Sequence, residues 1–231
     1  PLHARSIDGA EYMPGLVGLN SIRRSDHVNV IIQSLVRVPL LRDYFLRPKN
    51  YAHALGSPLV IEFGRLTRKV WSPHNFKGHV SPHELLQAIS QASKNRFKVG
   101  VVADPMDLLA WLLNSLHACL GGTRRPGSSV IHDAFQGTVR VTTEAAAATA
   151  AACRGDGSDN DDGDSTAAAG TAVETPFLFL TVDVPPPPLF KDALARNIIP
   201  QVPIFSCLSK FDGRTSQDTT NRDRPRYVIT P

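Results

Sequence analysis

The spacing of apolar residues changes near residue 125, and this change constrains the fold more than any other feature of the chain. Before that point, apolar side chains recur every three or four residues, which is the period of a helix that buries one face. After it, β-branched residues cluster in short runs between Gly and Pro, a pattern typical of strands. We therefore predict an α+β chain in which helices come first and strands follow.

The helical part holds four segments with clear start and stop signals. Pro58–Trp71 follows Ser57, a candidate N-cap, and places Pro58 at the first helical position. Ser81 and Glu84 are spaced as a capping box, in which each side chain bonds a backbone N–H. The predicted helices are His27–Val38 (stopped by Pro39), Pro58–Trp71, 81–93 and 104–122. The apolar face of the second helix is Leu59, Phe63, Leu66 and Val70, that of the third is Leu85, Leu86 and Ile89, and that of the fourth is Leu108, Leu109, Leu112, Leu113 and Leu116.

The later part is predicted to hold strands and one insertion. Residues 144–172 pass from an alanine run into Gly, Ser and Asp, and such a segment cannot bury enough apolar surface to offset its ordering entropy, so we expect disorder. Pro203–Phe211 is predicted to be a short helix. The last strand is expected to lack partners, which would leave an exposed edge and make the chain poorly soluble by itself. The predicted strands are Val130–Ile131, Thr138–Thr143, Phe177–Val184 and Arg226–Thr230.

Charge and composition narrow the class of protein. The 231 residues carry a formal net charge of +4 and are 42% hydrophobic, which is ordinary for a globular domain. No apolar run approaches the roughly 20 residues that cross a bilayer, so no membrane partner is expected. The basic residues form small clusters, which are ordinarily solvated surface and which also suit an acidic or nucleic-acid partner. These clusters are Arg23-Arg24, Arg65/Arg68/Lys69, Lys94/Arg96/Lys98, Arg124-Arg125 and Arg222/Arg224/Arg226.

The three cysteines are widely spaced, which argues against a disulfide framework and favours a reducing compartment. Cys119 follows His117 by two positions on a predicted helix, so the two side chains do not face each other and do not form a nucleophile–base pair. Cys119 and Cys207 are instead expected to be buried small hydrophobic residues.

The segment Pro14–Leu35 carries the most specific motif of the chain. Its sequence, PGLVGLNSIRRSDHVNVIIQSL, resembles the cysteine box of ubiquitin-specific proteases, which reads roughly G-L-x-N-L-G-N-T-C-Y-x-N-S-x-L-Q. Gly18, Leu19, Asn29 and Gln33 match that pattern. The chain is therefore similar to a family of cysteine proteases that cleave ubiquitin from other proteins.

The residues at the family's reactive centre depart from its pattern. Asp26 stands where the cysteine nucleophile is expected, and Ser21, five residues earlier, stands where the family has an oxyanion-hole asparagine. Arg23 and Arg24 replace a small Gly and Asn, and we expect them to crowd the channel for the ubiquitin tail. A carboxylate is a far poorer nucleophile toward an amide than a thiolate, so Asp26 is expected to act as a helix N-cap. We therefore predict no catalytic residue and no enzyme activity.

Further segments carry the same resemblance. Asp104–His117 is similar to the family's thumb motif, Phe135–Gly137 to the F-x-G at the entry to the fingers, and Phe205–Phe211 to a later helix. The resemblance implies a papain-like ubiquitin-specific protease fold, truncated before the C-terminal half of the palm. The implied parts are a lead-in over 1–13 and the protease-like domain over 14–231, with a helical thumb at 14–125, the start of the β-rich fingers and palm at 126–231, and the insertion at 144–172.

Neither a metal nor a cofactor is expected. The fingers of many family members carry two C-x-x-C pairs that bind zinc, and the stretch after Phe135–Gly137 has none. His79 and His83 are four residues apart, but the predicted helix start at Ser81-Pro82 lies between them, so they do not share a helix face.

One branch of the family matches especially well. Its members lack the catalytic cysteine, as here, and act in assembly of the splicing machinery. The resemblance implies a nuclear, non-catalytic interaction module whose partners are proteins of the spliceosomal tri-snRNP, with weak ubiquitin binding and a secondary RNA contact left open. Two alternatives are kept, a residual cysteine-type deubiquitinase and an RNA-binding module that uses the basic clusters. The segments that carry this match are Tyr12–Asn20, Phe76–Leu86, Leu116–Thr123 and Ile198–Phe205.

Overall fold

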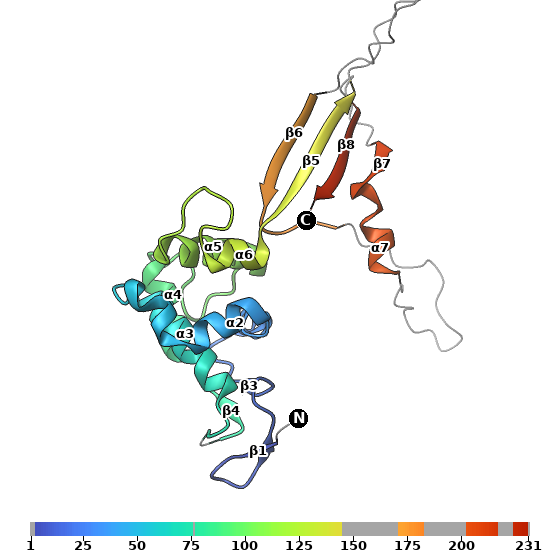
Figure 1. The fold of residues 1–231 in the computed structure, drawn as a ribbon. Helices are drawn as coiled ribbons and strands as arrows, with labels where there is room; N and C mark the ends of the chain where they lie inside the picture. The colour runs from blue at the N-terminus through green and yellow to red at the C-terminus, as the bar shows by residue number, and fades with distance from the viewer. Residues whose placement is uncertain (1–2, 76, 145–170, 183–201, 217–223, 231) are drawn as a thin grey trace, which may run out of the picture. The chain divides into compact units, whose positions relative to one another are not determined.

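The computed structural model describes residues 3–75, 77–144, 171–182, 202–216 and 224–230. The chain forms two compact units, Pro1–Phe135 and Gln136–Pro231. Helices make up most of the first unit, and a β-sheet makes up most of the described part of the second (Figure 1). The predicted α+β class, with helices before strands, is confirmed.

The first unit consists of helices and two pairs of two-residue strands. β1 (Ala4–Arg5) pairs antiparallel with β2 (Glu11–Tyr12), and β3 (Gly18–Leu19) pairs parallel with β4 (His79–Val80). No helix in the described ranges is long and apolar enough to cross a membrane. The helices are α1 (Asp26–Leu35), α2 (Pro39–Leu46), η1 (Pro48–Ala54), α3 (Pro58–Trp71), α4 (His83–Ala92), α5 (Pro105–Cys119) and α6 (Val130–Phe135).

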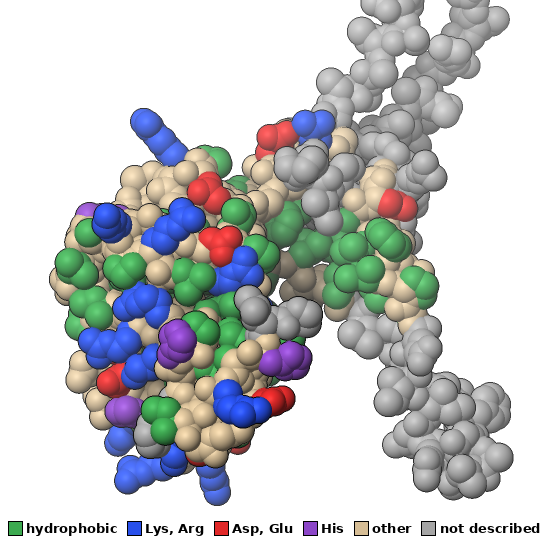
Figure 2. Space-filling model, turned by 60° about the horizontal axis from the view of Figure 1, so that its bottom comes forward, with side chains coloured by type: hydrophobic (Ala, Val, Ile, Leu, Met, Phe, Trp, Pro, Cys, Tyr) green, Lys and Arg blue, Asp and Glu red, His purple; other side chains and the backbone are tan. Residues whose placement is uncertain are grey.

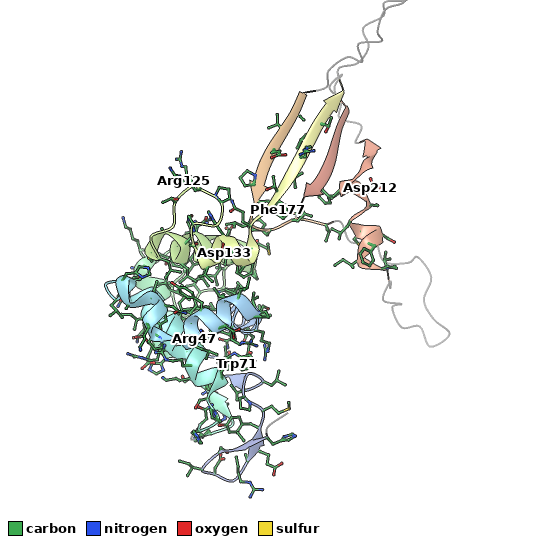
Figure 3. All side chains as sticks on the ribbon, viewed as in Figure 1. Arg47, Trp71, Arg125, Asp133, Phe177 and Asp212 are labelled. Carbon is green, nitrogen blue, oxygen red and sulfur yellow. The ribbon has the colours of Figure 1, made fainter. Side chains whose placement is uncertain are left out.

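The core of this unit is built on α3 and α5. α3 has the predicted bounds, and its predicted apolar face is buried. α5 begins one residue after the predicted start at Asp104, and the Asp104 carboxylate caps it by accepting a hydrogen bond of 2.7 Å from the Met106 N–H. Each large apolar side chain in this core contributes about 1.5–3 kcal/mol relative to leaving it exposed. The Trp71 indole at the end of α3 donates to the Val36 carbonyl at 2.9 Å, which ties α3 to the end of α1 (Figure 3).

The structure corrects the prediction for the first helix. α1 ends at Leu35 rather than Val38, and Pro39 begins a new helix, α2, instead of only stopping the first. Proline is well suited to a first helical position, where its missing N–H has no intrahelical partner to lose. α1 also exposes Val30 (57%), so the helix buries one face.

Two further predictions in this unit are wrong. The capping box at Ser81 does not form: Pro82 holds the N-cap position of α4 without a side-chain cap bond, and the Glu84 carboxylate binds Lys69 instead. Val130–Ile131 belongs to helix α6 rather than to a strand. Ile131 is fully buried in the helical core, and tertiary packing of this kind overrides β propensity.

The second unit contains a four-stranded antiparallel sheet in the order β6-β5-β8-β7. The central strand β5 pairs along its length with both β6 and β8, so that Val139 lies opposite Thr175 on one side and Ile229 on the other. Val139 is buried. The strands are β5 (Gly137–Glu144), β6 (Thr171–Phe177), β7 (Asp212–Ser216) and β8 (Arg224–Thr230), with the short helices α7 (Ile204–Cys207) and η2 (Ser209–Phe211) before β7.

The strand predictions are right for β5 and β8 and wrong in three respects. Phe177 ends β6, so the predicted strand from Phe177 onward is displaced, and residues 183 and 184 of that prediction lie outside the described part. β8 lies between β5 and β7 and is therefore not a bare edge. β7 was missed because its sequence, DGRTS, is rich in turn residues. The first residue of the predicted insertion, Glu144, is the last residue of β5, and its last two, Thr171 and Ala172, begin β6, so these three residues are strand rather than disordered. Residues 145–170 of the insertion lie outside the described part of the chain.

Candidate functional site

The candidate site is the turn that joins β3 to α1. Its entry is fixed by backbone pairing, because the Asn20 N–H donates to the Val80 carbonyl at 3.0 Å. Two amides of α1 hold the same segment from the helix side: Asn29 Nδ2 donates to the Asn20 carbonyl at 3.1 Å, and Gln33 Nε2 donates to the Val17 carbonyl at 2.9 Å. Two of the residues that match the cysteine box thus serve to clamp this turn.

Ser25 joins the turn to the start of α1 through hydrogen bonds on both sides. It is buried, and its hydroxyl oxygen accepts a hydrogen bond of 2.9 Å from the Ile22 N–H. Its carbonyl accepts from the N–H groups of Val28 and Asn29 at 3.0 and 2.9 Å, which starts α1. Ser25 therefore holds the N-cap position, although its side chain makes no cap bond to the helix.

Asp26 is the first residue of α1, one position past the predicted N-cap role, and that prediction is corrected. Its Oδ1 accepts a hydrogen bond of 2.7 Å from the Ser21 hydroxyl, and both side chains are exposed. A carboxylate in the first turn of a helix is favoured by the helix dipole. The sequence predicted that a carboxylate would be stable here, but not that Ser21 would bind it.

Arg23 and Arg24 adopt left-handed backbone conformations, with φ of 47° and 64°. Such φ values are uncommon for residues that carry a Cβ. Both side chains are exposed, and neither guanidinium makes a hydrogen bond or an ion pair with a residue in the described ranges. Gly100 lies beside this turn, since a Cβ built on it would come 3.6 Å from the Arg23 Cβ. The contact between Gly100 and Arg23 carries no signal in the sequence.

The space next to the turn is small. A cavity lined by Ser25, His27, Phe97 and Gly100, among others, holds about 10 Å³ of accessible space. That is about the room that one water molecule needs. Next to the turn, the buried Asn29 Oδ1 and Gln33 Oε1 have no hydrogen-bond partner among the residues described, while the nitrogen of each amide donates to the clamp.

The cysteines differ from the prediction. Cys119 is exposed and Cys207 is half-buried, so neither is the fully buried residue expected. At the end of α5 the core-facing position is taken by Leu120, which turns Cys119 toward solvent.

His117 is engaged elsewhere on α5. Its Nδ1 lies 2.7 Å from the Ser129 hydroxyl, and its ring stacks on His132 with centroids 3.8 Å apart. Burial, followed by the neighbouring His132, lowers the pKa of His117. In the parts of the chain that the structure describes, no group of three or more His, Cys, Asp or Glu side chains could hold a metal ion.

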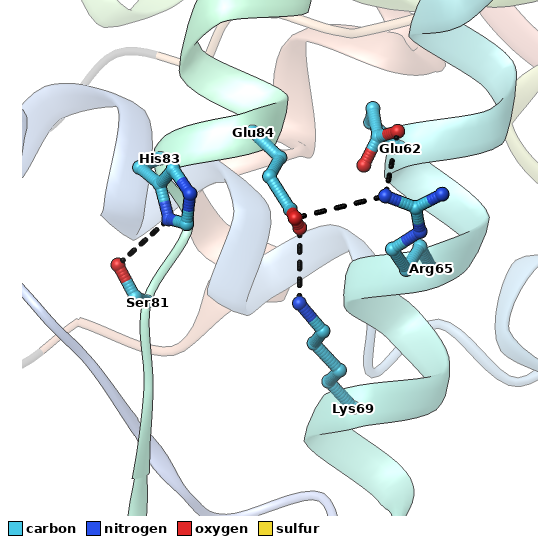
Figure 4. Close-up of polar contacts among 6 residues, drawn as sticks. All are labelled: Glu62, Arg65, Lys69, Ser81, His83 and Glu84. Carbon is cyan, nitrogen blue, oxygen red and sulfur yellow. Dashed lines mark hydrogen bonds and ion pairs between the residues drawn. The ribbon is translucent and has the colours of Figure 1, made fainter.

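The basic cluster on α3 is largely engaged in ion pairs (Figure 4). Lys69 Nζ lies 2.9 Å from a Glu84 oxygen, and Arg65 contacts Glu84 at 3.6 Å and Glu62 at 3.1 Å. The hydrogen bond from Lys69 lowers the pKa of the Glu84 carboxyl. Sequence reasoning missed the contacts of Glu84 because Glu84 lies on α4, whereas Arg65 and Lys69 lie on α3.

Comparisons with known proteins agree with the motif. The family model for ubiquitin carboxyl-terminal hydrolase matches residues 17–203. The chain is 42% identical to ubiquitin carboxyl-terminal hydrolase 39 of Homo sapiens over 221 residues, which cover 93% of this chain and 39% of that protein. It is 36% identical to the probable mRNA-splicing protein ubp10 of Schizosaccharomyces pombe over 222 residues, which cover 95% of this chain and 42% of that protein.

The fold also matches a solved structure. A crystal structure of an essential yeast splicing factor aligns with a TM-score of 0.61 at 20% identity, over 91% of this chain and 46% of that one. The chain spans about two fifths of the length of the curated relatives that it matches. Its helices, its sheet and its degenerate cysteine box together fit the family whose model covers most of its length. The chain belongs to the ubiquitin carboxyl-terminal hydrolase family and has the ubiquitin-specific protease fold.

Proposed function

We propose that this chain is a non-catalytic, ubiquitin-specific-protease-like interaction module that acts in pre-mRNA splicing in the nucleus. The observation that carries the loss of catalysis is the start of α1. The resemblance places the family's nucleophile at Asp26, and the carboxylate there accepts a 2.7 Å hydrogen bond from Ser21. The residue at the nucleophile position is thus a hydrogen-bond acceptor within the turn.

The chemistry of the site supports this proposal. A cysteine protease needs a thiolate, whose formation is favoured at a helix N-terminus beside a base, and a carboxylate does not replace it as a nucleophile toward an amide. The hydroxyl at the oxyanion position, that of Ser21, points its hydrogen bond at Asp26 rather than at a substrate oxygen. Removing one oxyanion donor from a protease costs about 2.7–4 kcal/mol of transition-state stabilisation.

Its place in splicing is proposed from its relatives. The chain is similar to a probable mRNA-splicing protein of fission yeast and has the fold of an essential yeast splicing factor. We propose that its partners are proteins of the spliceosomal tri-snRNP, whose assembly or stability it supports. We propose that ubiquitin is at most a weak partner, because the resemblance implies that Arg23 and Arg24 crowd the channel that receives the ubiquitin tail.

The loss of catalysis is tested with the full-length protein and two reagents, ubiquitin with an electrophilic C-terminal warhead and a ubiquitin–fluorophore substrate. We expect neither a covalent adduct nor turnover, while an active family member assayed in parallel gives both. An adduct on any cysteine, together with turnover that a Cys→Ala substitution removes, would establish the alternative of a residual deubiquitinase.

The splicing role is tested by depleting the protein from a splicing-competent nuclear extract. We expect the tri-snRNP peak in a glycerol gradient to fall and to return when the wild-type protein or its Asp26→Ala variant is added back. An unchanged tri-snRNP peak after depletion would refute the assembly role. Direct binding to naked RNA with a steep salt dependence would instead favour the RNA-binding alternative.

A further inference from the structure

A polar groove lies between the end of α3, the β3–β4 pair and the start of α4. It has a volume of about 380 Å³ and shares Asn20 with the start of the turn that carries Asp26. We propose that this groove binds a phosphorylated serine or threonine side chain of a protein partner.

The groove is lined by hydrogen-bond donors. Two lysines and two histidines face it, and three neutral polar residues and the buried Val80 complete the lining. Lys77, His79 and His83 are exposed and therefore available to a ligand. Lys, Arg and His side chains are also spread over the face of the helical unit seen in Figure 2. The basic residues of the groove are Lys69, Lys77, His79 and His83, and its neutral polar residues are Asn20, Asn75 and Ser81.

The frame of the groove is held by hydrogen bonds. The Asn75 N–H donates to the Tyr12 hydroxyl at 2.7 Å, and Asn75 Nδ2 donates to the Lys69 carbonyl at 2.9 Å. On the opposite side, Ser81 Oγ lies 3.2 Å from His83 Nδ1. These bonds hold Asn75, Ser81 and His83 in place, which reduces the ordering cost of binding at these three residues.

The charge balance favours an anion. Among the residues that the structure describes, no Asp or Glu lines the groove. Glu84 lies next to it and contacts Lys69 at 2.9 Å and Arg65 at 3.6 Å, and Glu62 contacts Arg65 at 3.1 Å, so the charges of this network balance. Lys77 supplies the further positive charge of the lining and acts electrostatically on the exposed Asp8. A phosphate group, with a charge of about −1.5 to −2 and three strong acceptor oxygens, suits several converging donors.

The lining favours a single phosphorylated side chain over RNA. Binding of single-stranded RNA typically uses aromatic side chains on which bases stack, and among the residues that the structure describes, residue 76 not being one of them, no aromatic side chain lines this groove. RNA also presents a row of phosphates, whereas Lys69 and Arg65, which would continue the positive track along α3, are held by glutamates. The compact set of donors matches one phosphate.

The test uses the full-length protein with isotope-labelled histidine and four probes. The probes are the peptide acetyl-Ala-Ala-phosphoserine-Ala-Ala-amide, its unphosphorylated form, inorganic phosphate and a 12-nucleotide oligouridylate. We expect the phosphopeptide to shift the NMR signals of His79 and His83, and the unphosphorylated peptide to leave them unchanged.

A second experiment measures the affinity for the phosphopeptide by calorimetry. We expect the Lys77→Gln/His79→Gln variant to bind it about tenfold or more weakly than wild type, because charge-assisted bonds are lost. The matched control, Lys49→Gln, removes an exposed lysine outside the groove and should bind like wild type.

Three results would overturn the proposal. Unchanged signals of His79 and His83 at millimolar phosphopeptide would mean that the groove does not bind it. Equal affinity for inorganic phosphate and phosphopeptide would mean an adventitious ion only. Tighter binding of the oligouridylate, with a salt dependence that reports several phosphate contacts, would assign the surface to nucleic acid.

Discussion

Ser21 donates a 2.7 Å hydrogen bond to the carboxylate of Asp26 across the turn that leads into α1. Between them stand two arginines with left-handed backbones and the buried Ser25, whose hydroxyl holds the Ile22 N–H. This hydrogen bond connects the start of the turn to the first residue of α1. Asp26 is therefore part of a self-contained structural turn, which supports the proposed loss of catalysis.

The first prediction concerns the coupling between Ser21 and Asp26. Asp26→Ala removes both this bond and a favourable charge in the first turn of α1, so it should lower the free energy of unfolding by about 1 kcal/mol. Ser21→Ala should lower it less. Urea unfolding of the two single variants and the double variant should give a coupling energy of about 0.5–1.5 kcal/mol.

The control for this cycle is Ser34→Ala, which removes the exposed bond from Ser34 Oγ to the Val30 carbonyl within α1. Its effect should stay within about 0.5 kcal/mol, as for most surface substitutions. Strictly additive effects of Ser21→Ala and Asp26→Ala would show that the bond does not contribute in solution.

The second prediction concerns reversion of the nucleophile. Asp26→Cys alone should not restore ubiquitin hydrolysis in the full-length protein, because Ser21, Arg23 and Arg24 leave the oxyanion donor and the channel altered. Combining it with Ser21→Asn, Arg23→Gly and Arg24→Asn should raise the rate of warhead labelling above that of Asp26→Cys. Equal labelling of the two variants would show that the surrounding turn does not limit reactivity.

The third prediction concerns Gly64 in the middle of α3. A Cβ at this position would overlap the hydroxyl group of Tyr51 and press on Phe45. Gly64→Ala should therefore destabilise the protein by about 1–3 kcal/mol through overpacking, although alanine is the better helix former by about 1 kcal/mol. Gly56→Ala is the matched control, since a Cβ there meets nothing within 4 Å. A thermal melt in which Gly64→Ala is as stable as wild type would contradict this packing.

The fourth prediction concerns pH and the Lys69–Glu84 pair. The folded protein lowers the pKa of Glu84 below its ordinary value of 4.5, chiefly through the hydrogen bond from Lys69. The stability that this pair contributes is therefore present above pH 4.5 and is lost as the pH falls through the folded pKa. Lys69→Gln should cost at most about 1 kcal/mol at pH 7, because the pair is partly exposed. The gap between wild type and variant, measured by urea unfolding, should close on acidification, and a gap that widens would refute the sign.

The fifth prediction concerns the stacked histidines. The pKa of His117 is lowered from its ordinary value of 6.5, first by burial and then by His132, so the folded state favours neutral His117. The stability from this group is complete above pH 6.5 and is lost as the pH falls through the folded pKa. His117→Gln should therefore flatten the fall in unfolding free energy on acidification from pH 7.5. His74→Gln, at an exposed histidine outside this pair, should leave the fall unchanged.

Local patterns predicted the helices well where one stripe of side chains meets one core. Pro58–Trp71 was found with its bounds, and most of the apolar face of α5 was found with its start, because the helical period and the start signals agree there. Local patterns failed where a contact with residues distant in the sequence replaced the contact expected from neighbouring residues. Glu84 leaves the predicted capping box for Lys69, and Ile131 is drawn into the helical core despite its β propensity.

The sequence by itself determined the family and the chemical identity of the turn before α1, because residue types at fixed spacing are enough to show a cysteine box that carries Asp26. Only the tertiary structure decided how that turn is held. Ser25 takes the cap position, Asp26 pairs with Ser21, and amides one and two turns along α1 clamp the preceding strand. The physical reason is that a hydrogen bond depends on distance and direction, which a folded backbone sets and a spacing pattern does not.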